Sequence, residues 1–125
     1  MPVRLDVVGI AVKDMAVSLQ FYRLLGLTVP GGAESKAHVE VDLGSVRLGW
    51  DSIGLLRKVY DGWEAPSGHR IELAFQCDAR DDVDAVYARM TGHGYRRHKA
   101  PLDAVRGQRY AIVEDPDGNL LSLYA

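Results

Sequence analysis

The sequence contains a single cysteine, Cys77, so an internal disulfide and a zinc site made of several thiolates are both excluded. We expect Cys77 to be a small hydrophobic side chain on a strand. Long apolar runs are also lacking, since none approaches the roughly twenty residues that a membrane-spanning helix needs. The N-terminus has no apolar segment of the kind found in signal peptides. These absences predict a soluble, cytoplasmic protein with no membrane partner.

The chain also lacks an excess of either charge. It has 15 Lys and Arg residues against 17 Asp and Glu residues, for a formal net charge of −2. A domain that binds nucleic acid is normally strongly basic, so we do not expect nucleic acid as a partner. Hydrophobic residues, in contrast, make up 47% of the 125 residues, which is enough for the core of one domain.

The clearest local pattern lies near the C-terminus, where Tyr110–Glu114 and Leu120–Tyr124 flank Asp115-Pro116-Asp117-Gly118-Asn119. Proline fixes a turn φ, aspartates bond the backbone ahead of them, and Gly118 supplies a positive φ without steric cost. The pattern predicts a β-hairpin. Strand alternation then puts Leu121 and Leu123 on one face. The other face is expected to carry Tyr110, Ile112, Ser122 and Tyr124.

The first half predicts a strand, a helix, a short strand and a hairpin. The helix has apolar residues at helical spacing, an N-cap at Asp14 and a stop at Gly26. The hairpin turns at Gly44-Ser45. The expected elements are a strand at Val3–Val12, a helix at Met15–Leu25, a short strand at Leu27–Val29, and paired strands at His38–Leu43 and Val46–Trp50.

The second half repeats this order. Its expected elements are a strand at Arg70–Cys77, a helix at Asp81–Met90, a short strand at Tyr95–His98, and the final hairpin. The order strand–helix–strand–strand–strand therefore occurs twice at a spacing of about 65 residues. We predict one α+β domain over residues 1–125, with βαβββ repeats at about 3–52 and 69–125. Between them, an irregular linker at about 53–68 contains a helical turn at Leu55–Tyr60.

The Asp115–Asn119 turn, together with Gly9-Ile10-Ala11-Val12-Lys13-Asp14 and Phe21-Tyr22-Arg23-Leu24-Leu25-Gly26-Leu27, resembles the vicinal oxygen chelate superfamily. That superfamily includes glyoxalase I, extradiol dioxygenases, fosfomycin-modifying enzymes and bleomycin-resistance proteins. The resemblance covers essentially the whole chain. It implies that the repeats form a curled mixed sheet around a cleft, within one chain or across a homodimer, and that a small molecule binds there. It does not fix the activity, because this scaffold hosts isomerases, oxygenases, transferases and plain binders.

Metal-using members of the superfamily place about four His and Glu ligands on the cleft face. The resemblance carries the first of these positions onto Val7 and the last onto Ser122. The ligand of the first half falls near Arg47 or Gly49, and only Glu72, in the fifth strand, keeps a carboxylate. One carboxylate does not build a divalent-metal site. We therefore predict no metal and no other cofactor, the alternative being one divalent ion such as Zn, Ni, Mn or Fe.

The remaining metal-ligating residue types are scattered. His38 and Glu40 share a strand face, and Glu72 could approach them, but we interpret the pair as the solvent face of a half-exposed strand. The other histidines are interpreted as loop, helix-end and edge-strand residues without a ligand role: His69, His93 and His98.

The candidate binding groups are mainly aromatic, because aromatic rings hold a planar ligand by stacking and edge contacts. They are Arg47, Trp50, Tyr60, Trp63, Tyr110, Ser122 and Tyr124. Glu72 is the candidate catalytic residue, as a general base. The structural alternatives are that Trp50 and Tyr124 fill the core, and that Glu72 is held by Arg47.

Two charged runs have structural explanations. Acidic residues in Asp78–Asp82 are suited to capping the second helix. The basic run Arg96–Lys99 is suited to protecting an edge strand from pairing with another chain, with anion steering as the alternative.

These observations favour a small-molecule-binding protein, a homodimer whose metal-free cleft holds a planar, partly apolar compound such as a drug or metabolite. The alternative within the superfamily is a metal-dependent or Glu72-based lyase, isomerase or dioxygenase. A structural or regulatory module with an empty cleft is the third hypothesis. Loss of the ligands at Val7 and Ser122 favours binding over metal catalysis, and the aromatic residues favour it over an empty cleft.

Overall fold

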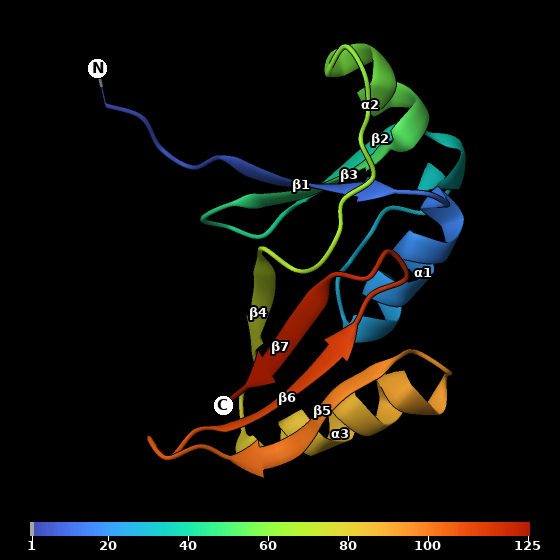
Figure 1. Ribbon diagram of the computed structural model, residues 1–125. Helices are drawn as coiled ribbons and strands as arrows, with labels where there is room; N and C mark the ends of the chain where they lie inside the picture. Colours follow the sequence, from blue (N-terminus) through green and yellow to red (C-terminus); the bar gives the residue numbers. More distant parts are fainter. Residues whose placement is uncertain (1) are drawn as a thin grey trace. The chain divides into compact units, whose positions relative to one another are not determined.

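The computed structural model describes residues 2–125 as an α+β protein with seven β-strands and three α-helices (Figure 1). The chain divides into two compact units, a first unit that ends at Pro66 and a second unit at Ser67–Ala125. Each unit has its own sheet and its own core. No helix within residues 2–125 has the length and apolarity needed to cross a membrane.

The first unit contains a three-stranded sheet, the first sheet, in the order β1-β3-β2. Strand β1 pairs in parallel with β3, and β2 pairs antiparallel with β3. Its elements are β1 (Val7–Val12), α1 (Met15–Leu25), a 3-10 helix (Ala33–Ser35), β2 (His38–Asp42), β3 (Arg47–Ser52) and α2 (Ile53–Val59).

Helix α1 begins and ends where its sequence predicts. The Asp14 side chain accepts a hydrogen bond from the backbone N–H of Val17 at 3.2 Å, which satisfies one of the free donors of the first turn. Gly26 ends the helix at a φ of 126°, which a side chain would disfavour. The buried face of α1 covers one face of the first sheet, where the Tyr22 ring meets the Trp50 ring edge-on at 5.2 Å.

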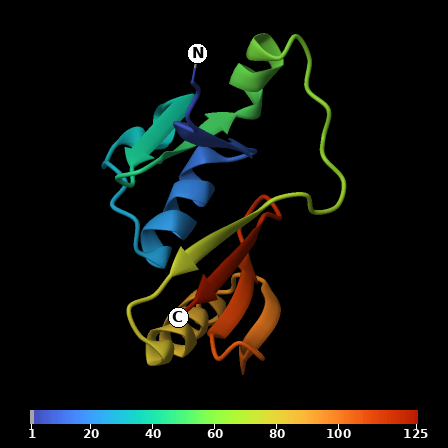
Figure 2. The same cartoon turned by 90° about the vertical axis from the view of Figure 1, so that its left-hand side faces the viewer.

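The second unit contains a four-stranded sheet, the second sheet, in the order β4-β7-β6-β5. Strands β4 and β7 are parallel, and the other pairs are antiparallel. Helix α3 lies across one face of this sheet (Figure 2). Its elements are β4 (Glu72–Gln76), α3 (Arg80–Gly92), β5 (Arg97–Asp103), β6 (Arg109–Glu114) and β7 (Leu120–Tyr124). The fully buried residues of the second unit come from α3 and from the sheet face that it covers: Val83 and Met90 of α3, and Ala111, Val113, Leu121 and Leu123 of β6 and β7.

The β6–β7 turn confirms the hairpin prediction. The buried Asp115 carboxylate accepts hydrogen bonds from the N–H groups of Asp117 and Asn119 and from the Asn119 side chain, at 2.8–2.9 Å. Gly118 adopts a φ of 88° and donates its N–H to the Asp115 carbonyl. Asp115 and Asn119 also close the ladder through a backbone bond of 2.9 Å. The turn therefore locks the register of β6 against β7.

Two strands expected in the first half of the chain differ from the structure. Strand β1 starts at Val7, and residues 3–6 are exposed outside it. The short strand expected at Leu27–Val29 does not form, so the first repeat has three strands where four were expected. The physical cause is the Arg23 guanidinium, which donates to the carbonyl oxygens of Val29 at 3.4 Å and Pro30 at 2.6 Å. These carbonyls are satisfied by a side chain, without a neighbouring strand.

Two other elements are longer than the sequence suggested. The expected helical turn at Leu55–Tyr60 is part of α2, which Ser52 caps by accepting from the N–H of Leu55 at 3.2 Å. Strand β5 runs over Arg97–Asp103 and not Tyr95–His98, with two register shifts against β6. Such bulges let an edge strand continue through irregular pairing.

The Asp115 turn generates a stability prediction. Asp115→Ala should lower the free energy of unfolding by about 2–4 kcal/mol, because it leaves two backbone N–H groups and one side-chain amide without their charged acceptor. Asp115→Asn keeps one acceptor oxygen for the backbone and should lose clearly less. Urea unfolding followed by circular dichroism measures both. Equal stability of the Ala variant and the natural protein would contradict this role.

Candidate functional site

Each sheet has one face that its long helix does not cover. The first open face is the side of the first sheet opposite α1, and the second open face is the side of the second sheet opposite α3. Residues paired across strands share a face, so the ladder registers give the members of each. The first open face carries Val7, Gly9, Ala11, His38, Glu40, Asp42, Arg47, Gly49 and Asp51.

A chain of alternating charges crosses the first open face. His38 Nδ1 lies 2.5 Å from Asp51 Oδ1, and His38 Nε2 lies 3.0 Å from Glu40 Oε2. Arg47 donates to the other oxygen of Glu40 and, at 2.5 Å, to Asp6 Oδ2. We call these five side chains the charge network; it ties β2 and β3 to each other and to the segment before β1.

The charge network favours the charged forms of His38 and Arg47. Hydrogen bonds from His38 to Asp51 and then to Glu40 raise the pKa of the imidazole above its ordinary value. The hydrogen bond to His38, with Arg47 adding to it, lowers the pKa of the Glu40 carboxyl. An imidazolium with both nitrogens donating has no lone pair for a metal ion. His38 and Arg47 are therefore neutralised by acids of their own face.

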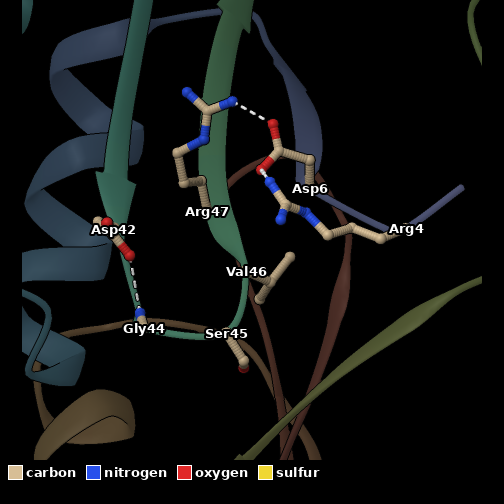
Figure 3. Close-up of a pocket in the computed structure, with 7 residues that line it drawn as sticks. All are labelled: Arg4, Asp6, Asp42, Gly44, Ser45, Val46 and Arg47. Atoms are coloured by element: carbon tan, nitrogen blue, oxygen red, sulfur yellow. Dashed lines mark hydrogen bonds and ion pairs between the residues drawn. The ribbon is translucent and has the colours of Figure 1, made fainter.

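A pocket of about 310 Å³ adjoins the charge network at the end of the first sheet, next to the β2–β3 turn. Figure 3 shows the guanidinium groups of Arg4 and Arg47 both directed at the Asp6 carboxylate, with Arg4 at 4.0 Å. Asp42 in turn accepts from the N–H of Gly44 at 2.8 Å. The polar groups of this pocket thus bind one another.

The second open face carries the residues that strand alternation placed together. Arg109 and Ala125 exchange two backbone hydrogen bonds of 2.9 and 3.0 Å, so the next pair, Tyr110 and Tyr124, is a pair without ladder bonds. Side chains of such pairs lie closer together than those of bonded pairs. The registers confirm that Tyr110, Ile112, Ser122 and Tyr124 share a face, with Leu121 and Leu123 on the other.

The second open face is arranged in rows across the strands. The middle row has small or medium side chains, Ala74, Ser122 and Ile112. The row on one side is aromatic and amide, with Gln76, Tyr124 and Tyr110. The row on the other side holds Glu72, Leu120 and Glu114. A flat molecule on the middle row would therefore have two tyrosines beside it and carboxylates at the opposite side.

The Glu114 carboxylate is compensated locally. It lies 3.6 Å from His69 Nε2 and 3.7 Å from an Arg96 guanidinium nitrogen, and its side chain is 13% exposed. The His69 ring meets the His98 ring edge-on at 5.9 Å. Sequence reasoning treated these histidines as isolated residues, because their proximity arises from the path of the chain before β4 and within β5.

The structure brings four predicted site residues of the second unit onto one face. Glu72, Tyr110, Ser122 and Tyr124 share the second open face. Arg47 lies on the first open face, where its partners are Glu40 and Asp6. His38 and Glu40 share a strand face as expected, but the partner of His38, Asp51, and the partner of Arg47, Asp6, were missed.

The remaining residues that the sequence singled out each lie within one of the two units. Trp50 is fully buried against Tyr22 in the core, which is the structural alternative, and its Nε1 has no hydrogen-bond acceptor among residues 2–125. Tyr60 and Trp63 follow α2, with their rings stacked at 6.4 Å and Tyr60 60% exposed. His93 ends α3, with Nδ1 2.8 Å from the Arg89 carbonyl, and Cys77 is half-buried just after β4.

No group of three or more His, Cys, Asp or Glu side chains in the described part of the chain could hold a metal ion. The positions that the resemblance gave for metal ligands have the following neighbours. Val7 is paired with Arg47, so an apolar and a cationic side chain stand side by side. Ser122 lies between Ala74 and Ile112.

The charge network generates a prediction about pH. Because the pKa of His38 is raised above 6.5 on folding, its stabilisation is complete below pH 6.5 and is lost as the pH rises through the folded pKa. The natural protein should therefore melt about 2–4 °C above His38→Gln near pH 5.5, and this margin should shrink towards pH 9. Differential scanning calorimetry of both proteins measures it. A margin that stays constant with pH would show that His38 acts by packing alone.

Comparisons with known proteins agree with the fold. The family model of the Glyoxalase/Bleomycin resistance protein/Dioxygenase superfamily matches residues 4–123. A search of curated proteins finds no match. Among solved structures, a glyoxalase/bleomycin resistance protein/dioxygenase family enzyme from Burkholderia phytofirmans PsJN has a TM-score of 0.85 at 21% sequence identity, covering 98% of both chains.

Two further structures carry more specific names. Lactoylglutathione lyase from Agrobacterium tumefaciens has a TM-score of 0.72 at 16% identity, covering 99% of this chain and 94% of that one. TioX from Micromonospora sp. ML1 has a TM-score of 0.66 at 21% identity, covering 97% of each chain. At these identities the likeness shows the fold alone. With the family model matched over nearly its whole length, the chain belongs to the Glyoxalase/Bleomycin resistance protein/Dioxygenase superfamily.

Proposed function

We propose that this protein binds a planar, partly apolar small molecule on its second open face, without a metal ion. The observation that carries the proposal is the pair of adjacent tyrosines, Tyr110 and Tyr124, beside the row of small side chains. Two aromatic rings beside a row of small side chains offer stacking and edge contacts to a flat ligand. Their hydroxyl groups can orient it.

The charge network argues against the first open face as the binding surface. His38 and Arg47 already have carboxylate partners, so a ligand anion would have to displace Asp51, Glu40 or Asp6. The free energy lost by breaking these ion pairs would offset the free energy gained from binding the anion. The second open face has no comparable closed set of ion pairs across its middle row.

The donor set supports a metal-free mode of binding. Metal-using members of the superfamily need His and Glu at positions that here are Val7, Arg47 or Gly49, and Ser122. A valine has no donor atom, an arginine repels a divalent cation, and a neutral serine is a weak ligand. Glu72 is the one carboxylate among these positions.

One observation favours a second function, catalysis by Glu72. This carboxylate is exposed on the second open face and makes no ion pair within residues 2–125. It stands in the row next to Ala74 and Ser122, within the surface proposed to hold the ligand. There it could accept a proton from a bound substrate as a general base.

We also propose that the protein is a homodimer, as the superfamily resemblance implies. Strands β1 and β4 each lie at the edge of their sheet, where one row of backbone groups has no strand partner among the described residues. Light scattering against the chain mass of 13.8 kDa tests this.

The binding proposal predicts the effect of removing either tyrosine. A planar compound that raises the melting temperature in a thermal-shift screen should bind about tenfold more weakly to Tyr110→Leu and to Tyr124→Leu, since each ring contributes on the order of 1 kcal/mol. Tyr87→Leu is the matched control, because Tyr87 lies on α3, which covers the other face. Isothermal titration calorimetry measures the affinities.

Two further experiments distinguish metal-free binding from metal-dependent binding and from catalysis by Glu72. Binding should persist in excess EDTA, and its loss on chelation would contradict the metal-free mode. Glu72→Gln should shift affinity only modestly if the protein is a binder, but should abolish turnover of the same compound if Glu72 is a base. Equal weakening by the Tyr87 variant and the two test variants would place the ligand elsewhere.

A further inference from the structure

Strand β5 contains a bulge that changes which face Lys99 occupies. Arg97 is paired with Val113, and Lys99 is paired with Ile112, so two steps along β5 match one step along β6. In a regular ladder Lys99 would stand opposite Ala111, which is fully buried on the α3 side. The extra residue turns Lys99 onto the second open face.

The Lys99 ammonium is placed beside the tyrosine pair. Its Nζ lies 6.0 Å from the centroid of the Tyr110 ring, within the range of a cation–π contact. Through its partner Ile112, Lys99 belongs to the same row as Ser122. An ammonium, an aromatic ring and a hydroxyl-bearing strand residue thus lie on one small area of the second open face.

Lys99 combines its contact with the Tyr110 ring with the lack of an acidic partner among residues 2–125. Arg80 and Arg109 both bind Asp103, Arg109 also binds Asp84, and Arg96 approaches Glu114. Lys99 makes no ion pair among residues 2–125. A cation held over an aromatic ring without a carboxylate is free to bind an anion from solution, and such charge-assisted bonds are about twice as strong as neutral ones.

We propose that the ligand of the second open face carries an anionic group, of the carboxylate class, which binds Lys99 while its planar part contacts Tyr110 and Tyr124. This inference rests on the proposed function and names its ligand class. In the opposite row the Glu72 carboxylate has no ion pair among residues 2–125, so it disfavours an anion there and orients the ligand with its charge at β5.

Protection of an edge strand is the competing explanation for Lys99. A lysine on β5 discourages pairing with another chain, and any surface-directed cation of that strand would serve. That role requires neither the bulge nor proximity to Tyr110, and it gives no preference for an acid over a neutral compound. Arg97 is a matched control, because it lies on the same strand but is paired with Val113, whose face α3 covers.

The test compares planar carboxylates with their neutral amides. The probes are benzoate, 2-naphthoate and indole-3-carboxylate, each paired with its carboxamide, titrated into the full chain by calorimetry. For at least one pair the acid should bind about tenfold more tightly than the amide, a difference of about 1.4 kcal/mol. Lys99→Gln should remove this preference and leave amide affinity unchanged, Lys99→Arg should keep it, and Arg97→Gln should not alter it.

The outcomes distinguish this inference from the proposed function. If acid and amide bind equally, or if Lys99→Gln leaves the acid preference intact, the anion site is overturned, while weaker binding by Tyr110→Leu would still support the proposed function. If no probe of the panel binds the natural protein, the proposed function is overturned and the anion site with it. Melting curves of each variant check that it is folded before it is titrated.

Discussion

The arrangement of the second unit depends on how one carboxylate, Asp115, fixes a turn. By binding the N–H groups of Asp117 and Asn119, it closes the β6–β7 hairpin in a single register. The side-chain period of a strand is two residues, so a slip of one would exchange the two faces of the sheet. A slip of β7 would take Leu121 and Leu123 out of the core and turn Tyr124 towards α3, away from Tyr110. The turn therefore positions the candidate site as well as the core.

Local sequence rules predicted the structure correctly where the backbone hydrogen bonds are made by residues close in the sequence. The cap at Asp14, the stop at Gly26 and the hairpin alternation follow from neighbours in sequence, and the structure confirms them. The rule failed at Leu27–Val29, where a side chain six residues away takes the carbonyl of Val29. It also misplaced Trp50, because strand content alone does not reveal that a large ring packs against Tyr22.

At the candidate site, too, sequence rules predicted the regular parts and failed where an irregular strand or a contact between strands decides which face a side chain occupies. The faces of Tyr110, Ser122 and Tyr124 could be predicted because the hairpin between them is regular. The face of Lys99 could not, since a bulge breaks the alternation within β5 and nothing in Arg96–Lys99 marks where the extra residue falls. The partners of His38 and Arg47 were missed for a related reason: Asp51 and Asp6 reach them through the ladders between strands, which sequence spacing does not specify.

The two open faces differ in the partners of their cations. On the first open face both cations of the charge network, His38 and Arg47, have carboxylate partners, and these ion pairs hold β2, β3 and the segment before β1 together. On the second open face an ammonium stands over an aromatic ring without an acid beside it. Because a superfamily scaffold of this kind hosts many functions, the specific chemistry must come from such local differences. Among residues 2–125, the charge network therefore leaves His38 and Arg47 paired within the protein, whereas Lys99 on the second open face makes no ion pair and is the cation that the proposed ligand would meet.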